Sequence, residues 1–384
     1  MINNCSSCNS SKFKVLYKIK SFPVFWGAIP KEQLKKIKSY PFELSYCKNC
    51  GLVQQSKRLD EKIINKVYTA EYYNCPSPLI SGMGVSEIEK FINFFKKCKN
   101  KPGKIMEVAC FDGYLLKQLK KLKWDVHGCD PCSTADIAIK ILGNKRIKKV
   151  FFEKGVYPKE SFDAVVFRNL LEHIYEPNNF LKEVRESLKN GGKIFIDVPN
   201  LKEVIKLGGF GLFFHQHVTY FTIKSIDTLL SKNGFKITNY YEGKPNLFVE
   251  AVKISRPKIK NIKNKDEKIL KKLANQSVLM KKKAHKLFDN KQIKKIVIFG
   301  SSALATTLIG TLNKKQLEKV KLVVDNDSEK HKKYLCGSNF EIVSPKKILD
   351  IDYDLIFVTS HFFPNQIKSS LRSIGVDISK VYCI

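Results

Sequence analysis

The 384-residue chain is predicted to be an α/β protein built on doubly wound parallel sheets. Two patterns predict this fold class. Short apolar runs alternate with segments of helical periodicity between about residues 67 and 255, and the alternation restarts after residue 290. Strands of a parallel sheet are covered on both faces, so they are apolar throughout and are separated along the chain by helices. The length itself suggests two or three domains.

The central region shows this pattern most clearly. Its expected buried strands are 104–109, 124–130, 162–167 and 193–198. Helical periodicity marks the segments 113–123, 133–142 and 178–189. This order predicts a sheet with helices on both faces.

A second, smaller unit of the same kind follows. The basic segment 256–268 is interpreted as a linker or as the exposed start of a helix that runs to about residue 290. After it, we expect strands at 295–300, 320–325, 353–360 and 380–384, and helices at 303–314 and 364–374. We therefore predict three domains: residues 1–66, which have paired cysteines and few regular elements, residues 67–255 and residues 256–384.

Composition excludes several classes of protein. Hydrophobic residues make up 43% and charged residues 27%, which is typical of a globular chain. Lys and Arg exceed the acids by 69 − 36 = 33, but the lysines are spread along the whole chain, so the charge alone does not indicate nucleic acid. No apolar run reaches the roughly 18 residues of a membrane helix, and the N-terminus lacks the apolar core of a signal peptide. We expect a cytoplasmic protein with no membrane span.

Four of the eleven cysteines form two CxxC pairs. The pairs are Cys5 with Cys8, and Cys47 with Cys50. Each pair can place two thiolates on one side of a tight turn, and two pairs complete the S4 shell that zinc prefers. The alternatives are unrelated thiols or a redox pair. Because four protein ligands leave no open position, we expect a structural zinc ion.

The first βα unit of the central region carries candidate cofactor residues. Glu107 lies inside the first strand, Asp112 and Gly113 form the turn after it, and Asp130 ends the second strand. An acid at that place can accept hydrogen bonds from ribose hydroxyls. Because the G-x-G-x-x-G cradle of a dinucleotide is missing, the sequence favours a cofactor with a ribose but no phosphate, such as S-adenosylmethionine (SAM).

The segment FDAVVFRNLLEHIYEPNNFLKEVRESLKNGGKIFIDVPN (162–200) resembles class I SAM-dependent methyltransferases. The EH dipeptide at 172–173 and the GG turn at 191–192 stand where these enzymes have them. The resemblance implies a class I methyltransferase sheet for the central domain. It also implies that Arg168 and Asn169 lie at the cofactor.

Over nearly the whole chain, the sequence resembles three-domain sugar C-methyltransferases that act on nucleotide-linked keto-sugars. The family motif E-[IV]-G-S-N-D-G-Y-L-L is similar to EVACFDGYLL (107–116), and Y-H-E-H-L-S-Y-F-S is similar to FHQHVTYFT (214–222). The resemblance implies an N-terminal four-cysteine zinc domain and a C-terminal Rossmann-like domain. Ala109 replaces a family glycine, Gln216 replaces a family glutamate, and the sugar-site segment is only weakly similar at 243–248.

The HQH segment is the candidate catalytic site. His215 and His217 are expected on one face of an extended segment. In the resembled family the second histidine is the base, which implies that His217 removes the proton next to a ketone while the resulting enolate attacks the SAM methyl group. His215 and Gln216 would orient the substrate or the base. A family tyrosine falls at Tyr72 or Tyr73. We expect His173 to pack a loop near the cofactor.

Three alternatives to sugar C-methylation stay open. One is O-methylation of a surface-polysaccharide sugar. Another is methylation of RNA, which the net charge and the cysteine knuckles favour. The third is a non-catalytic scaffold, because the turn at Ala109 lacks its usual glycine. The lysines show no clustering in sequence, so nucleic acid is the less favoured partner.

Overall fold

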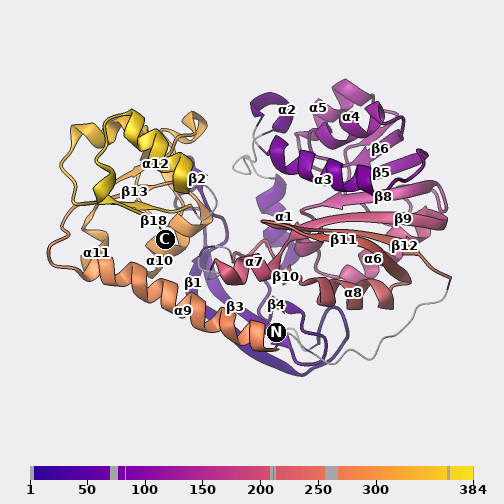
Figure 1. Cartoon of the computed structure of the whole chain (residues 1–384), viewed down its shortest axis with the longest axis horizontal. Coiled ribbons are helices and arrows are strands. Elements are labelled where there is room, and N and C mark those ends of the chain that lie inside the picture. The colour runs from indigo at the N-terminus through magenta and orange to yellow at the C-terminus, as the bar shows by residue number, and fades with distance from the viewer. Residues whose placement is uncertain are drawn as a thin grey trace.

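The computed structural model describes residues 4–69, 77–82, 84–207, 211, 213–255, 267–360 and 364–383. The central sheet and the C-terminal sheet lie at opposite ends of the molecule, and N-terminal strands lie between and below them (Figure 1). None of the helices in the described part of the chain has both the length and the apolar character needed to cross a membrane.

The central sheet has seven strands in the order β11-β12-β9-β8-β5-β6-β7. Five of them are parallel, and β12 and β11 join antiparallel at one edge. Their bounds are β5 Lys104–Val108, β6 Asp125–Cys129, β7 Ile147–Lys148, β8 Phe162–Arg168, β9 Leu188–Pro199, β11 Phe235–Glu242 and β12 Asn246–Lys253. The four strands expected from the sequence are confirmed. Gly191 and Gly192 lie inside β9 rather than before it.

Helices cover both faces of this sheet because the buried strands are apolar on both sides. On one face, α3 (Val85–Lys97), α4 (Tyr114–Lys121) and α5 (Ala135–Leu142) share one apolar core with the sheet. On the other, α6 (Pro177–Ser187) and α8 (Ile223–Lys232) pack into a second core. The central region is thus the α/β sandwich that the sequence predicts, with an antiparallel edge that the prediction did not include.

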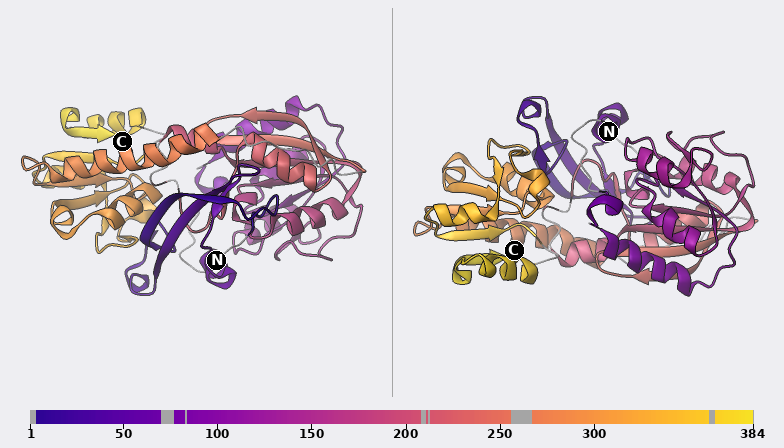
Figure 2. Two further views of the ribbon diagram at one scale, coloured as in Figure 1. Left: turned by 90° about the horizontal axis from the view of Figure 1, so that it is seen from below. Right: turned by 90° about the horizontal axis from the view of Figure 1, so that it is seen from above.

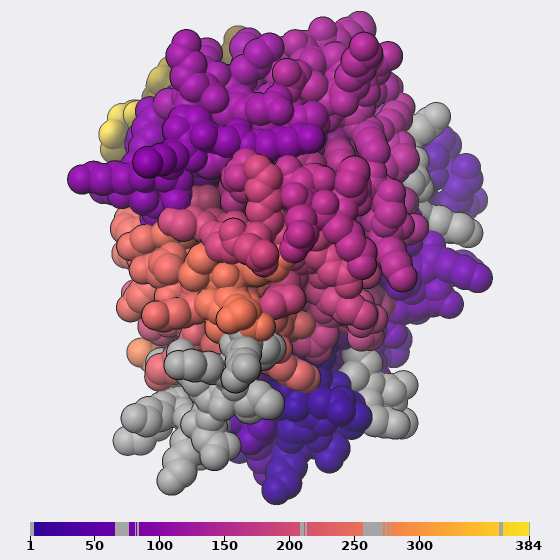
Figure 3. Space-filling model, turned by 90° about the vertical axis from the view of Figure 1, so that its right-hand side faces the viewer, coloured from indigo at the N-terminus to yellow at the C-terminus, as the bar shows by residue number. Residues whose placement is uncertain are grey.

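The N-terminal region contains long strands. An antiparallel sheet in the order β1-β3-β4-β10 is formed by β1 (Phe13–Pro23), β3 (Ser39–Cys47), β4 (Val53–Gln55) and β10 (Thr219–Tyr220). The expectation of few regular elements in residues 1–66 is therefore wrong. Because β10 belongs to the central region, between β9 and β11 along the chain, its pairing with β4 joins the N-terminal region and the central region through one sheet. They also lie against each other at the surface (Figure 3).

The C-terminal region has a parallel sheet in the order β16-β14-β13-β17-β18. Its strands are β13 Ile296–Phe299, β14 Val320–Val324, β16 Ile342–Val343, β17 Leu355–Val358 and β18 Val381–Cys383. The surrounding helices are α9 Glu267–Asp289, α10 Ala303–Thr311, α11 Lys314–Leu317 and α12 Pro364–Ser373. The expected strands and helices of this region are confirmed, apart from small differences at their ends.

Segments from elsewhere in the chain hold this C-terminal sheet in place. The long helix α9 contacts β1 and α7 (Leu201–Lys206) and extends along one side of the molecule (Figure 2). The backbone N–H of Gly27 donates to Thr306 Oγ1 in α10 at 3.2 Å. The short strand β2 (Ala28–Ile29) pairs with β15 (Tyr334–Leu335). The N-terminal region therefore contacts both of the other regions.

Candidate functional site

The four cysteines of the two CxxC pairs come together. Their sulfur atoms all lie within 4.8 Å of one another. The Sγ atoms of Cys5 and Cys50 are 3.5 Å apart, and those of Cys8 and Cys47 are also 3.5 Å apart. A tetrahedral zinc ion with bonds of about 2.3 Å places its sulfur ligands about 3.8 Å apart. The sulfur positions therefore fit a zinc ion with only small side-chain shifts.

The backbone after each CxxC pair explains how the knuckles form. Asn9 and Gly51, which directly follow the pairs, have φ angles of 63° and 76°. Such left-handed positions are typical of Gly and Asn. The N–H groups of Asn9 and Gly51 donate to the carbonyls of Cys5 and Cys47, each at 2.9 Å. Both turns thus point their sulfur atoms toward the same point.

The turn after β5 follows a tight left-handed path. Ala109, Phe111 and Gly113 have φ angles of 59°, 50° and 79°. A Cβ atom on Gly113 would lie 2.9 Å from Ala138 Cβ, so only glycine fits there. The backbone of Ala109 has a left-handed conformation that glycine adopts more easily than alanine. This is a physical reason for the glycine of the resembled family at that position.

Asp112 and Asp130 both use their carboxylates to hold this turn. Asp112 Oδ2 accepts hydrogen bonds from Ser77 Oγ at 2.7 Å and from the N–H of Leu79 at 2.8 Å. Asp130 accepts from the N–H groups of Phe111 at 2.9 Å and Cys132 at 2.8 Å. Each carboxylate oxygen can accept more than one hydrogen bond. That Asp112 and Asp130 contact a cofactor stays a prediction, and the structure gives both a role in shaping the turn.

Glu107 is a buried acid at the end of β5. Burial raises its pKa well above the usual value, Asp112 and Asp130 add to this effect, and Arg168 opposes it. Its Oε2 is buried and has no hydrogen-bond partner among the described residues. An acceptor in this state fits a ligand that brings a hydroxyl or amino donor to the carboxyl ends of the strands.

Arg168 and Asn169 follow the carboxyl end of β8. The Arg168 guanidinium donates through Nε to Asp197 Oδ2 at 2.9 Å and forms an ion pair with the same oxygen through Nη2 at 2.8 Å. It also lies over the ring of Phe91. The N–H of Asn169 donates to the carbonyl of Asp197 at 2.7 Å, and the Asn169 side chain is exposed. Arg168 is therefore fixed by an internal ion pair, and its expected cofactor contact stays a prediction.

The HQH segment is held by Gln55 of the N-terminal sheet. Gln55 Nε2 lies 3.2, 2.9 and 2.8 Å from the carbonyl oxygens of Phe214, His215 and His217. The N–H of Gln55 also donates to Val218, next to the pairing of β4 with β10. One buried amide thus fixes the whole loop.

His215 and His217 do not share a face. The segment turns, with the N–H of His217 donating to Phe214, so the alternation expected for an extended segment does not apply. The His215 ring packs against Phe22 and Phe42, with Nε2 3.2 Å from the Phe22 carbonyl. Burial lowers the pKa of His215 to about 4. The structure thus places His215 in a packed aromatic environment, away from His217.

His217 instead lies beside Glu172 and His173. Glu172 Oε1 is 3.9 Å from Nε2 of both histidines, and the imidazole rings are 4.6 Å apart and nearly perpendicular. Burial lowers the pKa of His173 to about 4 and that of His217 well below its usual value, and burial raises the pKa of Glu172. His173 Nδ1 lies 2.9 Å from the carbonyl of Gln216. We call Glu172, His173 and His217 the EHH cluster.

Two parts of this site are not predictable from the sequence. His173 is expected there only as a loop-packing residue, and neither Glu172 nor Gln55 is expected at the site. The adjacent EH dipeptide was a signal, but its approach to His217 depends on contacts 44 residues apart along the chain. Tyr72 and its alternative Tyr73 lie outside the described residues. The side chain of Gln216 is buried, and its Oε1 has no partner among the described residues.

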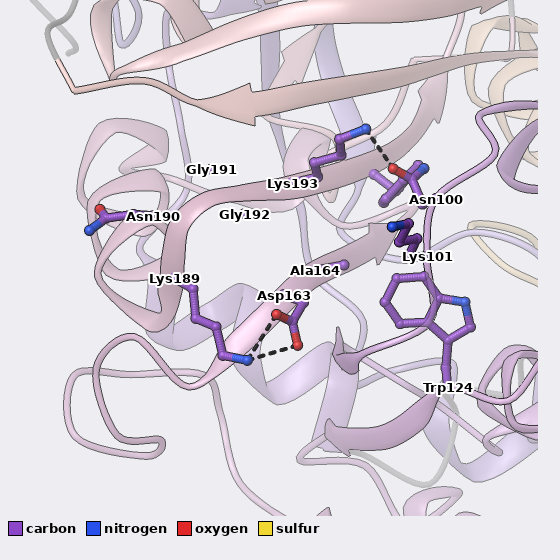
Figure 4. Close-up of a pocket in the computed structure, with 11 residues that line it drawn as sticks. Asn100, Lys101, Trp124, Asp163, Ala164, Lys189, Asn190, Gly191, Gly192 and Lys193 are labelled. Atoms are coloured by element: carbon purple, nitrogen blue, oxygen red, sulfur yellow. Dashed lines mark hydrogen bonds and ion pairs between the residues drawn. The ribbon is translucent and has the colours of Figure 1, made fainter.

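A surface pocket lies at the end of the central sheet opposite the carboxyl ends of its parallel strands (Figure 4). It is lined by the first half of β9 and by residues at or near the starts of β5, β6 and β8. Lys189 pairs with Asp163 at 2.8 Å, and Lys193 pairs with Glu250 at 2.8 Å. Because it lies away from the carboxyl ends of the strands, where ligands bind in sheets of this kind, this pocket is not the candidate site.

Comparison with known proteins supports a methyltransferase. Residues 84–240 match the family described as "Methyltransferase domain", and residues 292–382 match "C2185-like, N-terminal". Over 74 residues the chain is 31% identical to the C-methyltransferase NovU of Streptomyces niveus. This aligned segment covers 19% of this chain and 18% of that protein. It is 26% identical over 176 residues to the tRNA U34 carboxymethyltransferase of Campylobacter fetus subsp. fetus, covering 43% of this chain and 62% of that protein.

A solved structure is also similar. The 1,6-didemethyltoxoflavin-N1-methyltransferase of Burkholderia thailandensis, solved with S-adenosylhomocysteine, is 13% identical with a TM-score of 0.41, covering 53% of this chain and 96% of that one. The chain spans less than two thirds of the length of each curated relative. The family match places a methyltransferase domain within residues 84–240.

Proposed function

We propose that the protein is a SAM-dependent methyltransferase whose cofactor binds at the carboxyl ends of β5, β6 and β8. The observation that carries this proposal is the match of residues 84–240 to a methyltransferase domain. Two observations support this location of the cofactor: the left-handed turn from Ala109 to Gly113, and the oxygen of Glu107 that has no partner among the described residues. Asp130, Arg168 and Asn169 would complete the surroundings of the cofactor.

The EHH cluster would prepare the methyl acceptor. Arg168 interacts electrostatically with both Glu107 and Glu172, so the cluster lies close to the proposed cofactor turn. When bound, SAM supplies an electrophilic methyl group, and the protein must align and activate the acceptor. That His217 is the general base stays a prediction. Its low pKa keeps the imidazole neutral near pH 7, as a base requires.

For the substrate, we propose a nucleotide-linked keto-sugar that is methylated at the carbon next to its ketone. The likeness to a C-methyltransferase over 74 residues and the sugar C-methyltransferase motifs at 107–116 and 214–222 support this substrate class. The likeness to a tRNA-modifying enzyme keeps RNA as the second candidate. O-methylation of a sugar is the remaining alternative.

We further propose that Cys5, Cys8, Cys47 and Cys50 hold a structural zinc ion. The fit of their sulfur positions supports it. The ion would stabilise the N-terminal sheet, whose strand β4 carries Gln55 next to the HQH loop.

The test combines binding and product analysis. SAM and S-adenosylhomocysteine are titrated into purified protein by calorimetry, and nucleotide-linked keto-sugars are then offered with methyl-labelled SAM. A product whose new methyl carbon is bonded to a ring carbon in the NMR spectrum supports the full proposal. No SAM binding overturns the methyltransferase function. If SAM binds but the label is found in RNA, or on an oxygen of the sugar, the methyltransferase function stands. In that case only the proposed substrate and methylated atom are overturned.

A further inference from the structure

The EHH cluster has the composition of a metal site. Two imidazole nitrogens and one carboxylate oxygen, one from each residue, all lie within 4.8 Å of one another. The two Nε2 atoms face the same oxygen, Glu172 Oε1, at 3.9 Å each. These separations are too long for hydrogen bonds, so the three groups converge without bonding one another directly.

The carboxyl group of Glu172 needs a partner. Its side chain is 1% exposed, and neither oxygen has a hydrogen-bond partner among the described residues. A buried carboxylate without donors is strongly unfavourable, because it loses its hydration and gains nothing in return. The Nδ1 of His173 faces the carbonyl of Gln216 and must donate to it, so the Nε2 of a neutral His173 ring is also an acceptor. A cation bound between the three groups would give the carboxyl group of Glu172 the partner that it lacks among the described residues.

The surroundings fix the ligands as they do in known metal sites. His173 Nδ1 lies 2.9 Å from the carbonyl of Gln216, and such a contact orients a metal-binding imidazole and selects Nε2 as its ligand atom. On the other side, Gln55 holds the carbonyl of His217 at 2.8 Å, and the ring of Phe214 packs on the His217 ring at 4.1 Å. Metal–ligand bonds of about 2.0–2.2 Å need only small side-chain movements from the observed positions.

We propose that Glu172, His173 and His217 bind one divalent first-row transition-metal ion. Two histidines and one carboxylate suit such ions, whereas the four cysteines suit zinc, so the chain holds two sites of different chemistry. Three protein ligands leave open positions, to which an oxygen of the methyl acceptor can bind. The use of the ion rests on the proposed methyltransferase function, but its binding does not. A nitrogen that binds the ion cannot take a proton, so His217 becomes a ligand in place of the base predicted from the sequence.

The test uses Mn²⁺, which thiolates bind poorly and whose free form gives a strong electron paramagnetic resonance signal. Titration of the full-length protein should remove the free signal with one ion per chain. Glu172→Gln keeps the shape of the side chain and removes its charge, and should weaken binding by more than about 10-fold. His215→Gln is the matched control, because His215 belongs to the same loop but lies outside the cluster, and its binding should be unchanged. Thermal melts confirm that the variants are folded.

A measurement on the unmodified protein keeps the test independent of variant folding. Bound Mn²⁺ should show spin-echo modulation from imidazole nitrogen. Absence of binding, absence of nitrogen coupling, or equal affinity in Glu172→Gln overturns the site. SAM calorimetry on the same sample separates the two proposals. Mn²⁺ binding without SAM binding sinks only the methyltransferase function, and SAM binding without Mn²⁺ binding sinks only the metal site.

Discussion

The side-chain amide of Gln55 lies 2.8 Å from the carbonyl oxygen of His217. Gln55 is the last residue of β4, and His217 belongs to the loop before β10. The pairing of β4 with β10 extends this contact into a sheet. The N-terminal region is therefore a structural part of the candidate site, although it supplies none of the EHH side chains.

Replacing Gln55 with leucine should loosen the HQH loop. The carbonyls of Phe214, His215 and His217 would lose their donor, at a cost of roughly 1–3 kcal/mol in the free energy of unfolding. Chemical denaturation measures this loss, and hydrogen exchange at residues 215–218 should accelerate. Gln54→Leu is the matched control, because Gln54 contacts Ser6 in the first cysteine knuckle. If both variants show the same exchange at 215–218, Gln55 does not hold the loop.

One zinc ion per chain should remain bound after dialysis, and Cys8→Ser with Cys47→Ser should remove it. Loss of two thiolates from a four-sulfur shell leaves too few ligands for tight binding. The melting temperature should fall with it, because the ion ties the segment before β1 to the turn between β3 and β4. Elemental analysis gives the metal content. Cys383→Ala, at a thiol far from the cluster in sequence, should keep the zinc, and zinc retained in the double variant would refute the site.

Much of the fold follows from local patterns, and much of the site does not. The strands β8 and β13 are predictable because each is a mostly apolar run, and β5 and β6 because their shorter apolar stretches alternate with helices. The strand β1 was missed although its apolar residues alternate with lysines, because the cysteine pairs suggested an irregular region. A half-exposed antiparallel strand of this kind has a weaker signal than a buried parallel one.

The EHH cluster depends on contacts that no local pattern contains. Glu172 and His173 lie in the short turn Leu171–His173 after β8, whereas His217 is placed by Gln55 and by the hydrogen bond from the N–H of Val218 to the carbonyl of Glu172 at 2.8 Å. The four cysteines were predictable because spacing alone defines two knuckles. Side chains brought together by a strand from another region cannot be paired from spacing.

Asp130→Asn should weaken SAM binding. The variant keeps the shape of the side chain but replaces one acceptor oxygen by a donor, which cannot accept from the N–H groups of Phe111 or Cys132. The turn and the proposed ribose contact would both suffer. Asp125→Asn, at the start of the same strand and half exposed, is the control and should bind SAM normally. Calorimetric titration compares the two, and equal affinities would place the cofactor elsewhere.

Ala109→Gly should stabilise the protein. The left-handed φ of 59° costs an L-residue roughly 1–2 kcal/mol, and glycine loses about 0.5–1 kcal/mol of that gain through its greater freedom in the unfolded chain. Ala138→Gly, at an ordinary helical position in α5, should instead lose about 1 kcal/mol. Urea unfolding measures both changes. A destabilised Ala109→Gly variant would show that the methyl group packs better than its backbone angle suggests.

The last prediction concerns the dependence of stability on pH through Asp325 in the C-terminal sheet. Burial acts to raise the pKa of Asp325, but Lys330 and the N–H groups of Ser301 and Asp327 outweigh it, so the pKa lies below its usual value. A lowered folded-state pKa contributes stability above the unfolded pKa of about 3.9, and that contribution is lost as the pH falls further through the folded value.

The free-energy difference between the unmodified protein and Asp325→Asn should therefore be constant from pH 7 to about pH 5 and should shrink toward pH 3. Denaturant unfolding at each pH measures it. Asp352→Asn is the control, because its side chain is 93% exposed and its difference from the unmodified protein should stay small at every pH. A difference for Asp325→Asn that grows on acidification would mean that the folded protein holds this carboxyl protonated, with burial outweighing Lys330.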